Sequence, residues 1–291
     1  MAVSLVIVAL VVVAVAGPWL APHAPTDVVG LPYAPPGPGL PLGTDYLGGD
    51  VASRLLHGGR TVVMLALAAS FLGYLVGGGI GLAAGLFGHA DSVLMRPVDV
   101  LLALPPFLLL AVLAAGTGRG TIVVVMAAVL ANAPGIARVV RAATLEVGVR
   151  GYVEVALARG ESWPRVAARD VLPNIAAPML TDVGSRVSAT IAMVAGANFL
   201  GLGLQPPTAD WALMVAENRA GLALQPWAVL APALTIAVLT IAVNLGGDEI
   251  AARLRRATTA VTTLRGGIAP SGHPVVKKAG QPVVKKEGAP S

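Results

Sequence analysis

Six stretches of the chain contain no Asp, Glu, Lys or Arg and are rich in Val, Leu, Ile and Ala. A helix that crosses a bilayer needs roughly 20 apolar residues, and these stretches reach or approach that length. The pattern predicts an all-α fold, a polytopic membrane bundle of six transmembrane helices. The expected spans cover about residues 2–22, 61–88, 97–117, 120–142, 182–204 and 226–247.

The first stretch has two interpretations. Ala14-Val15-Ala16 resembles a signal-peptide cleavage site, but no Lys or Arg precedes the apolar residues, so the basic segment of a signal peptide is missing. Five further spans follow, and an uncleaved first helix fits their number. We therefore expect this stretch to remain as a membrane anchor.

The basic residues indicate how the bundle is oriented, because cytoplasmic loops of membrane proteins carry an excess of Lys and Arg. With the N-terminus inside and six crossings, 15 of the 20 Lys and Arg residues fall in the inner segments. We expect a multi-pass protein of the cytoplasmic (inner or plasma) membrane with both termini cytoplasmic.

Glycine and proline add two expectations about helix packing. Four glycines recur at a spacing of four from Gly73 to Gly85, which forms a smooth stripe on a helix and lets a neighbouring backbone approach closely. Pro105-Pro106 falls in the third span. A kink is expected there, because proline removes a backbone donor and clashes with the preceding turn.

Composition supports a membrane protein and excludes several other classes. Charged residues make up 12% of the chain and hydrophobic residues 56%. An ordinary soluble domain has about 25% charged residues. The chain has no cysteine, which excludes disulfide scaffolds and thiol nucleophiles. Its arginines fall between apolar stretches and its aromatic residues are scarce, so no nucleic-acid partner is expected.

The chain also lacks the usual residue patterns of catalysis. No lysine follows a glycine, so there is no phosphate-binding loop for ATP. The four histidines lie far apart in the sequence, which leaves no Ser–His dyad and no helical pair of metal-ligating histidines. Asp99 and Asp182, near the ends of expected spans, are interpreted as solvated carboxylates. We expect no catalytic residue, no metal site and no cofactor in this chain.

The connection between the fourth and fifth spans is the most informative segment. It is expected to form a cytoplasmic coupling loop over residues 143–180. Six Arg and four acidic residues are distributed among Val, Leu and Ala from Arg138 to Asp170. Loops this long are functional or disordered, and the apolar periodicity argues against disorder. The segment is therefore expected to dock on a partner.

Within this loop, Glu154-Val155-Ala156 is followed after three residues by Gly160, and twelve positions later by Leu172-Pro173. This spacing resembles the EAA loop of binding-protein-dependent ABC importer permeases. Val155 replaces the middle alanine of that pattern, and Asp170 occupies a position that is usually apolar.

Two further segments are similar to the DppC/OppC-type permeases of dipeptide and oligopeptide importers. Residues 42–56 (LGTDYLGGDVASRLL) resemble the segment before the second span, although Gly49 stands where an arginine is common. Residues 199–207 (FLGLGLQPP), followed by Asp210-Trp211 and Met214, resemble the end of the fifth span. The resemblance extends over residues 1–256.

The resemblance implies the type I ABC importer permease fold and the role of one permease subunit, which moves peptides or a related small solute by alternating access. It implies four kinds of partner: a second, DppB/OppB-like permease, two ATP-binding subunits, an extracytoplasmic solute-binding protein and the lipid bilayer. ATP and Mg are then bound by the partner subunits, and this chain is not an enzyme. Nickel chelate or haem are alternative cargoes. A stand-alone secondary carrier or channel, and a membrane-embedded enzyme, are the alternatives from other classes.

Three groups of residues are expected to carry these functions. Coupling to the ATPase subunit is expected at Tyr152, Glu154, Val155, Ala156, Ala158, Arg159, Gly160, Glu161 and Pro173. Contact with the binding protein is expected at Asp45, Asp50, Arg54, Asp210, Trp211 and Arg219. Candidates for lining the pathway are Asn132, Asn198 and Asn244, for which hydrogen bonding between helices is the alternative role.

The end of the chain differs from the rest. The pentapeptide Pro-Val-Val-Lys-Lys at residues 274–278 recurs at residues 282–286, among Gly, Ser, Pro and Ala. Residues 257–291 are therefore expected to form a flexible C-terminal tail, either natural or added to the protein.

Overall fold

The computed structural model describes residues 12–14, 16–148, 155–156 and 158–266, without the side chains of residues 254–266. Regular structure in this part of the chain is helical. Three isolated β-bridges, Val28–Gly49, Gly37–Leu40 and Thr44–Asp50, tie together the loop before the first long helix. The chain divides into two units, residues 1–254 and 255–291. The described part of the second unit is helical throughout.

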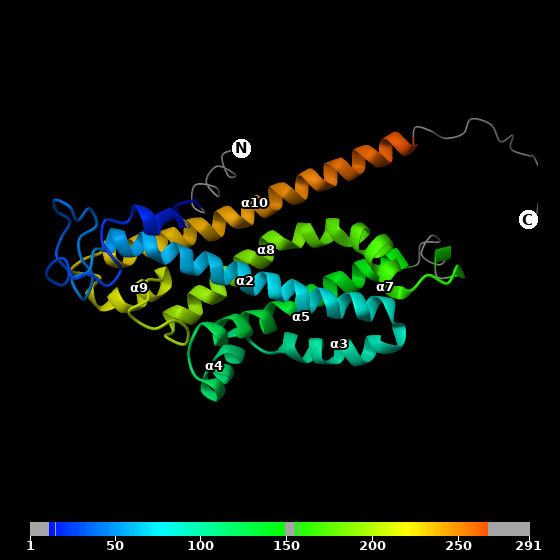
Figure 1. The fold of residues 1–291 in the computed structure, drawn as a ribbon, viewed down its shortest axis with the longest axis horizontal. Coiled ribbons are helices and arrows are strands. Elements are labelled where there is room, and N and C mark those ends of the chain that lie inside the picture. The colour runs from blue at the N-terminus through cyan, green and yellow to red at the C-terminus, as the bar shows by residue number, and fades with distance from the viewer. Residues whose placement is uncertain (1–11, 15, 149–154, 157, 267–291) are drawn as a thin grey trace, which may run out of the picture. The chain divides into compact units, whose positions relative to one another are not determined.

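Four long helices carry the fold (Figure 1): α2 (Val51–Leu86), α5 (Thr121–Gly148), α8 (Leu172–Phe199) and α10 (Trp227–Gly266). Two helices connect α2 to α5, namely α3 (Gly88–Ala103) and α4 (Pro106–Thr117). A short helix α7 (Trp163–Val166) and a π-helical turn η1 (Ala167–Val171) lead into α8. Helix α9 (Trp211–Asn218) and the 3-10 turn η2 (Arg219–Gly221) precede α10.

Within the described residues, three helices are long and apolar enough to cross a membrane: α2, α5 and residues 227–253 of α10. Helices α3 and α4 meet the same criteria only together, as a bent pair. Helix α8 does not meet them, and its sequence includes Asp182 and Arg186, which lower its hydropathy. The described residues thus supply three spans, or four with the bent pair. The expected span 2–22 lies largely outside them.

The helices begin and end at different residues from the expected spans. Helix α2 starts at Val51 rather than near residue 61, because the Asp50 side chain caps it by accepting hydrogen bonds from the N–H groups of Ala52 and Ser53 at 3.1 and 3.2 Å. Helices α5 and α8 both extend into residues 143–180. Residues 200–204 of the expected fifth span form a turn instead, in which Gly201 has a φ of +69°.

The kink expected at Pro105-Pro106 is confirmed. Helix α3 ends at Ala103, α4 begins at Pro106, and the two are bent by 96°. Leu104 lies in the extended region, as expected for a residue before proline. The sharp bend therefore follows from local backbone chemistry.

The close approach expected at the glycine stripe is also confirmed. Helix α5 packs along α2, and α8 packs against both helices. A Cβ atom added at Gly77 or Gly81 would overlap the carbonyl oxygen of Ala133 or Ala137 on α5. The backbones of α2 and α5 can approach each other this closely only because Gly77 and Gly81 have no side chain.

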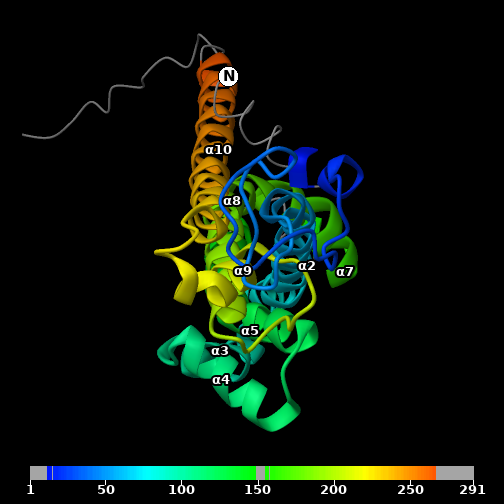
Figure 2. The ribbon, with the colours of Figure 1, turned by 90° about the vertical axis from the view of Figure 1, so that its left-hand side faces the viewer.

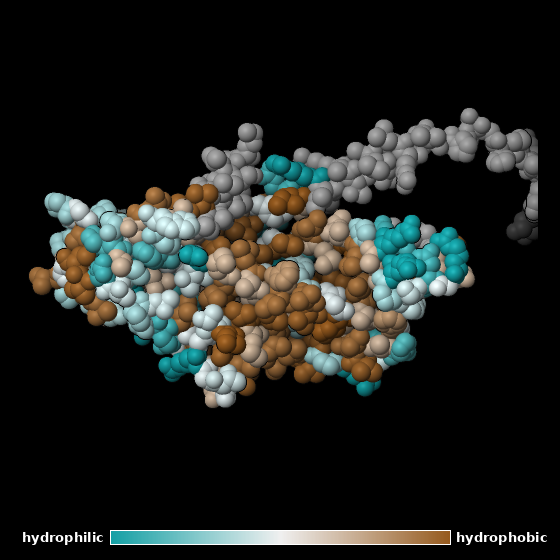
Figure 3. Space-filling model, viewed as in Figure 1, coloured by the Kyte–Doolittle hydropathy of each residue, from teal (hydrophilic) through white to brown (hydrophobic). Residues whose placement is uncertain are grey.

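The bundle has two chemically distinct ends. At one end, residues 21–50 and 200–226 pack over the helices and form what we call the cap; Figure 2 shows these loops lying across the same end of the bundle. Trp211 and Met214 of α9 join Val62 and Ala66 of α2 in its apolar core. Figure 3 shows apolar side chains gathered over the middle of the bundle, with hydrophilic surface at the cap and around α7.

Candidate functional site

The first candidate site is the connecting segment, residues 155–171, which lies between α5 and α8. A single helical turn ends at Gly160: the N–H of Arg159 donates to the Val155 carbonyl at 3.1 Å, and that of Glu161 to the Ala156 carbonyl at 3.2 Å. Gly160 has a φ of +80°, a left-handed conformation that favours glycine. Tyr152 and Glu154, both expected coupling residues, lie outside the described residues.

The connecting segment is anchored to the bundle by apolar contacts. Ala156 is only 2% exposed and packs in a buried cluster with Val140, Val166 and Ile175. The indole ring of Trp163 meets the ring of Phe87, at the corner between α2 and α3, edge to face with centroids 5.4 Å apart. These contacts attach the segment to α5, to α8 and to the corner between α2 and α3.

The remaining coupling candidates form the exposed face of this segment. Val155 is 53% exposed, and Ala158, Arg159 and Gly160 are exposed as well. No atom lies within 4 Å of a Cβ built on Gly160. Glu161 is half-buried and pairs with Arg159 at 3.2 Å, and Pro173 is exposed in the first turn of α8. Ala156 therefore faces its own chain, and its neighbours face outward.

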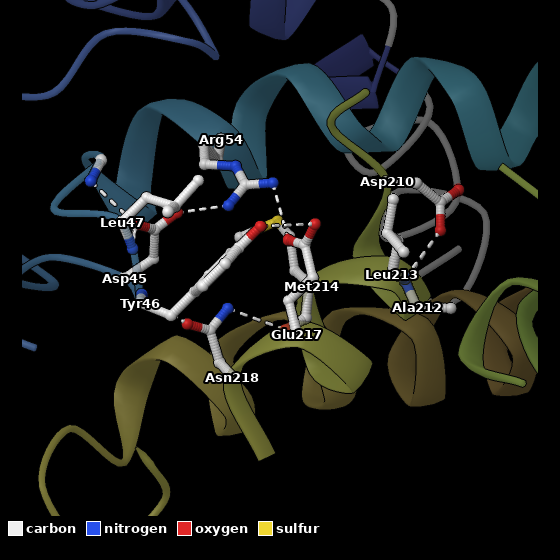
Figure 4. A network of polar contacts seen from close by, with 11 residues as sticks. Asp45, Tyr46, Leu47, Arg54, Asp210, Ala212, Leu213, Met214, Glu217 and Asn218 are labelled. Atoms are coloured by element: carbon white, nitrogen blue, oxygen red, sulfur yellow. Dashed lines mark hydrogen bonds and ion pairs between the residues drawn. The ribbon is translucent and has the colours of Figure 1, made fainter. Parts of the chain in front are cut away.

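The second candidate site is a buried ionic network in the cap (Figure 4). The Arg54 guanidinium binds the Asp45 carboxylate and also donates through Nη2 to Glu217 Oε2 at 2.8 Å. Asp45 accepts further hydrogen bonds from the N–H groups of Leu47 and Gly49 at 2.9 and 2.8 Å. The network joins the loop before α2 to α9, which follows it by more than 160 residues.

Tyr46 and Asn218 extend this network. The Tyr46 hydroxyl donates to Glu217 Oε1 at 3.2 Å, and its N–H donates to the Asn218 side-chain oxygen at 2.9 Å. Burial raises the pKa of Glu217 above its ordinary value, against the lowering effect of the nearby Arg54 charge. Burial and the Glu217 charge both raise the pKa of Tyr46, so its hydroxyl stays protonated.

Asp210 and Trp211 hold α9 against α2. Asp210 Oδ1 caps α9 by accepting hydrogen bonds from the N–H groups of Ala212 and Leu213 at 3.0 and 3.1 Å. The Trp211 indole N–H donates to the Leu55 carbonyl of α2 at 2.7 Å. Asp210 is fully buried, and this burial raises its pKa to about 6.

The structure thus buries five of the six side chains expected to contact a binding protein. Asp45, Asp50, Arg54, Asp210 and Trp211 are each at most 4% exposed within this single chain, where they cap helices and pair with one another. Their side chains lie in the interior of the cap and make their hydrogen bonds there. Arg219 alone of the six is exposed.

The third candidate site is a line of polar side chains inside the apolar bundle. Asp182 and Arg186 form an ion pair one turn apart on α8, with Arg186 Nε 2.9 Å from Asp182 Oδ2. The Tyr74 hydroxyl of α2 donates to the same oxygen at 3.3 Å. The Arg186 guanidinium lies against Gly135 of α5, where a Cβ would overlap it. We call this line, with the residues of the next paragraph, the polar seam.

One turn further along α8, Thr190 continues the polar seam. Its hydroxyl oxygen accepts from Ser70 of α2 at 3.1 Å and from the side-chain N–H of Asn132 of α5 at 3.2 Å. The Thr190 hydroxyl donates to the Arg186 carbonyl at 2.8 Å. Hence Asp182, Arg186 and Thr190, at i, i+4 and i+8, bring three helices together.

The three asparagines expected near the pathway do not lie together. Asn132 belongs to the polar seam. Asn198 is buried near the end of α8, and its side-chain oxygen accepts from the Leu204 N–H at 3.0 Å. Asn244 is exposed on α10. The alternative role, hydrogen bonding between helices, describes the contact that Asn132 makes with Thr190.

Sequence reasoning missed most of the polar seam. The prediction of a solvated carboxylate at Asp182 is wrong: its side chain is 18% exposed and is bound by Arg186 and Tyr74. The available signal was the recurrence of Asp182, Arg186 and Thr190 at a spacing of four on an apolar helix. Among the described residues, no three His, Cys, Asp or Glu side chains converge to hold a metal ion.

Comparison with known proteins shows the family. Residues 71–256 match the family described as binding-protein-dependent transport system inner membrane component. The chain is 35% identical over 249 residues to the di/tripeptide transport system permease protein DppC of Pseudomonas aeruginosa, covering 83% of this chain and 82% of that one. It is 34% identical over 253 residues to the glutathione transport system permease protein GsiD of Escherichia coli, covering 86% and 84%.

The fold is also that of a solved transporter subunit. A chain of the MetNI methionine ABC transporter in an inward-facing conformation superposes with a TM-score of 0.57 at 16% identity, covering 69% of this chain and 96% of that chain. The apolar helices and the family match indicate an integral membrane protein. This chain belongs to the family of binding-protein-dependent transport system inner membrane components.

Proposed function

We propose that this chain is one of the two permease subunits of an ATP-driven importer of peptides, and that residues 155–160 receive an ATP-binding partner subunit. The similarity to di/tripeptide and glutathione permeases along more than four fifths of the chain supports the substrate class. Nickel chelate and haem remain alternative cargoes, and peptide uptake measurements separate them.

The connecting segment is the observation that carries the docking proposal. Ala156 and Trp163 attach it to the bundle. On its outer face Ala158 has only a methyl group and Gly160 has no side chain, so this part of the face is open. At Ala158 and Gly160 such a surface lets the backbone of a partner approach closely. The exposed Arg159 on that face is paired with Glu161 at 3.2 Å.

The mechanism follows from this attachment. In the proposed orientation both termini and the connecting segment are cytoplasmic, and the cap faces the binding protein. Two ATP-binding subunits carry ATP and Mg and close on ATP, which moves the segment. Helix α8 follows the segment through η1, so the motion reaches the bundle and changes the access of the pathway. ATP can drive this change only by binding the closed state more tightly than the open one.

The docking proposal is tested by Ala158→Trp in the complete transporter, reconstituted with its binding protein. Ala158 is exposed, so the added ring is tolerated by this chain and clashes only with a docked partner. We expect loss of ATP-binding subunits on co-purification and loss of ATP-dependent dialanine uptake. Gly160→Asn, which tolerates a positive φ, should retain more of both. Ala115→Trp, an exposed change on α4, is the control.

Each outcome has a defined meaning. Wild-type assembly and uptake by Ala158→Trp would overturn the docking proposal. Dialanine uptake by this chain without ATP-binding subunits would identify a stand-alone carrier. Failure of the complete wild-type transporter to take up any peptide would overturn the substrate class.

Contact between the cap and the binding protein is tested at its exposed candidate. Arg219→Glu should change the stimulation of ATP hydrolysis by the peptide-loaded binding protein, because a surface charge at an interface steers association. Unchanged stimulation at low and moderate salt would argue against this face.

A further inference from the structure

A pocket of about 100 Å³ opens on the cap beside the buried ionic network. Asp45, Tyr46 and Arg54 of that network (Figure 4) form part of its wall. Residues 25–28, from the loop before α2, and Pro206-Pro207, from the loop before α9, line it as well. The pocket therefore brings the charged network and two surface loops of the cap into one site.

Much of the pocket wall is apolar. Pro25, Pro206 and Pro207 line it together with Val28 and Leu47. Val28 is 70% exposed and Leu47 is 55% exposed in this chain, and Figure 3 shows small apolar patches within the hydrophilic surface of the cap. At protein interfaces an anchoring side chain fills a pocket, while the contacts around it exclude water. A side chain that enters this pocket is therefore expected to have an apolar stem.

The charged groups at the pocket leave negative charge in excess. In the network, Asp45 and Glu217 share the single guanidinium of Arg54. Asp27 adds a third carboxylate at the pocket wall. Among the residues that line the pocket Arg54 is the one Lys or Arg, and two carboxylates already bind it. The pocket therefore favours a cation over an anion, because opposite charges attract.

Asp27 supplies the binding group for such a cation. It is exposed, and its Oδ2 accepts a hydrogen bond from the Ala24 N–H at 2.9 Å. Its Oδ1 has no hydrogen-bond partner among the described residues, whereas both oxygens of Asp45 are occupied, by Arg54 and by backbone N–H groups. One free oxygen suits the ammonium group of a lysine better than an arginine, whose planar fork binds both oxygens of a carboxylate.

We infer that a lysine side chain of the solute-binding protein enters this pocket, with its methylene stem against the prolines and its ammonium group on Asp27. The pocket is smaller than the roughly 300 Å³ that small-molecule sites need, and it accommodates one side chain. In the proposed orientation the cap is the end of the bundle that meets the binding protein. The inference rests on the proposed function and deepens it by naming the contact between the cap and that partner.

The test is Asp27→Asn in the complete transporter, reconstituted in lipid nanodiscs and titrated with its dialanine-loaded binding protein. Asparagine keeps an oxygen for the Ala24 N–H, so the loop should keep its conformation. We expect the dissociation constant of the binding protein to rise about 10- to 100-fold, the size of a lost charge-assisted hydrogen bond. Asp99→Asn on α3 is the matched control, because it removes an exposed carboxylate outside the cap and should bind as the wild type does.

Acetylated binding protein tests whether the group in the pocket is a lysine. Acetylation removes the lysine charges, and dialanine binding by the acetylated protein checks that it stays folded. Acetylation should weaken binding to the wild-type transporter more than binding to Asp27→Asn, because the two changes remove the same contact. Equal weakening for both transporters would overturn the inference, as would an unchanged dissociation constant for Asp27→Asn.

A second variant obstructs the pocket without touching a charge. Thr26 is exposed and lines the pocket, so Thr26→Trp adds a ring to its wall. We expect the dissociation constant of the binding protein to rise several-fold. Thr208→Trp, an exposed change in the same cap at a residue that does not line the pocket, should have a smaller effect. Equal effects of the two tryptophans would contradict the inference, even if Asp27→Asn fails to assemble.

A different occupant gives a different result. Loss of the second permease from purified Asp27→Asn or Thr26→Trp would place a group of that subunit in the pocket and would overturn the inference. ATP-dependent dialanine uptake by the wild-type transporter upholds the proposed function in each of these cases, so the two can fail separately.

Discussion

The cap network gives the sharpest prediction for stability. Arg54→Met removes the cation that neutralises Asp45 and Glu217, whose side chains are 1% and 7% exposed. Removing one partner from a buried ion pair costs about 3–5 kcal/mol, because the remaining charge is left uncompensated. Asp45 keeps two backbone N–H donors, whereas Glu217 keeps only the Tyr46 hydroxyl. We therefore expect most of the cost to arise at Glu217.

This reasoning predicts a graded series in thermal unfolding of the detergent-purified protein. A change of 1 kcal/mol shifts the midpoint by about 2–3 °C in a chain of this size, so Arg54→Met should lower it by about 6–15 °C. Adding Glu217→Gln removes the unpaired charge and should restore about half of the loss. Arg253→Met, which breaks an exposed pair, should cost less than about 1 kcal/mol.

The refuting result is equally specific. If Arg54→Met unfolds within 1 °C of Arg253→Met, the cap network does not stabilise this chain. If the double variant with Glu217→Gln is no better than Arg54→Met alone, the cost does not come from the unpaired carboxylate, and the lost packing of the arginine stem is the better explanation.

Three further predictions address packing, pH and coupling. Gly81→Val should push the α5 backbone away and cost about 1–3 kcal/mol in thermal unfolding, whereas Gly79→Val, with nothing within 4 Å of its Cβ, should cost far less. The raised pKa of Asp210, about 6, means that the folded state binds a proton that the unfolded state releases near pH 4, so stability should fall as the pH rises from about 4 to 6. Over that range the loss in the free energy of unfolding is about 2–3 kcal/mol. Asp210→Asn should remove this loss and be more stable at pH 7, measured as the unfolding midpoint against pH. Trp163→Ala removes the edge contact with Phe87, worth about 0.5–1.5 kcal/mol, and should reduce peptide-stimulated ATP hydrolysis with only a small drop in the unfolding midpoint.

Two of the candidate sites lie on one continuous element. The connecting segment passes through η1 into α8, and α8 carries Asp182 and Arg186 within its first four turns. The connecting segment and the charged pair of the polar seam therefore belong to one continuous part of the chain.

The sequence by itself determined the helical membrane bundle, because apolar runs, charge-free stretches and proline positions act locally. The break at Pro105-Pro106 and the close approach at Gly77 and Gly81 were both predictable for this reason. The resemblance in residues 154–173 likewise predicts the connecting segment as a docking site from spacing along the chain, and that role stays a prediction.

Only the tertiary structure decided which polar side chains meet. Arg54 pairs with Glu217, which lies 163 residues away in the sequence, and Tyr74 donates to Asp182, which lies 108 residues away. No local pattern specifies such partners, because they depend on which helices pack together and in what register. For that reason the sequence alone did not indicate that Arg54 binds Asp45 and Glu217 in the cap, or that Asp182 is bound by Arg186 and Tyr74.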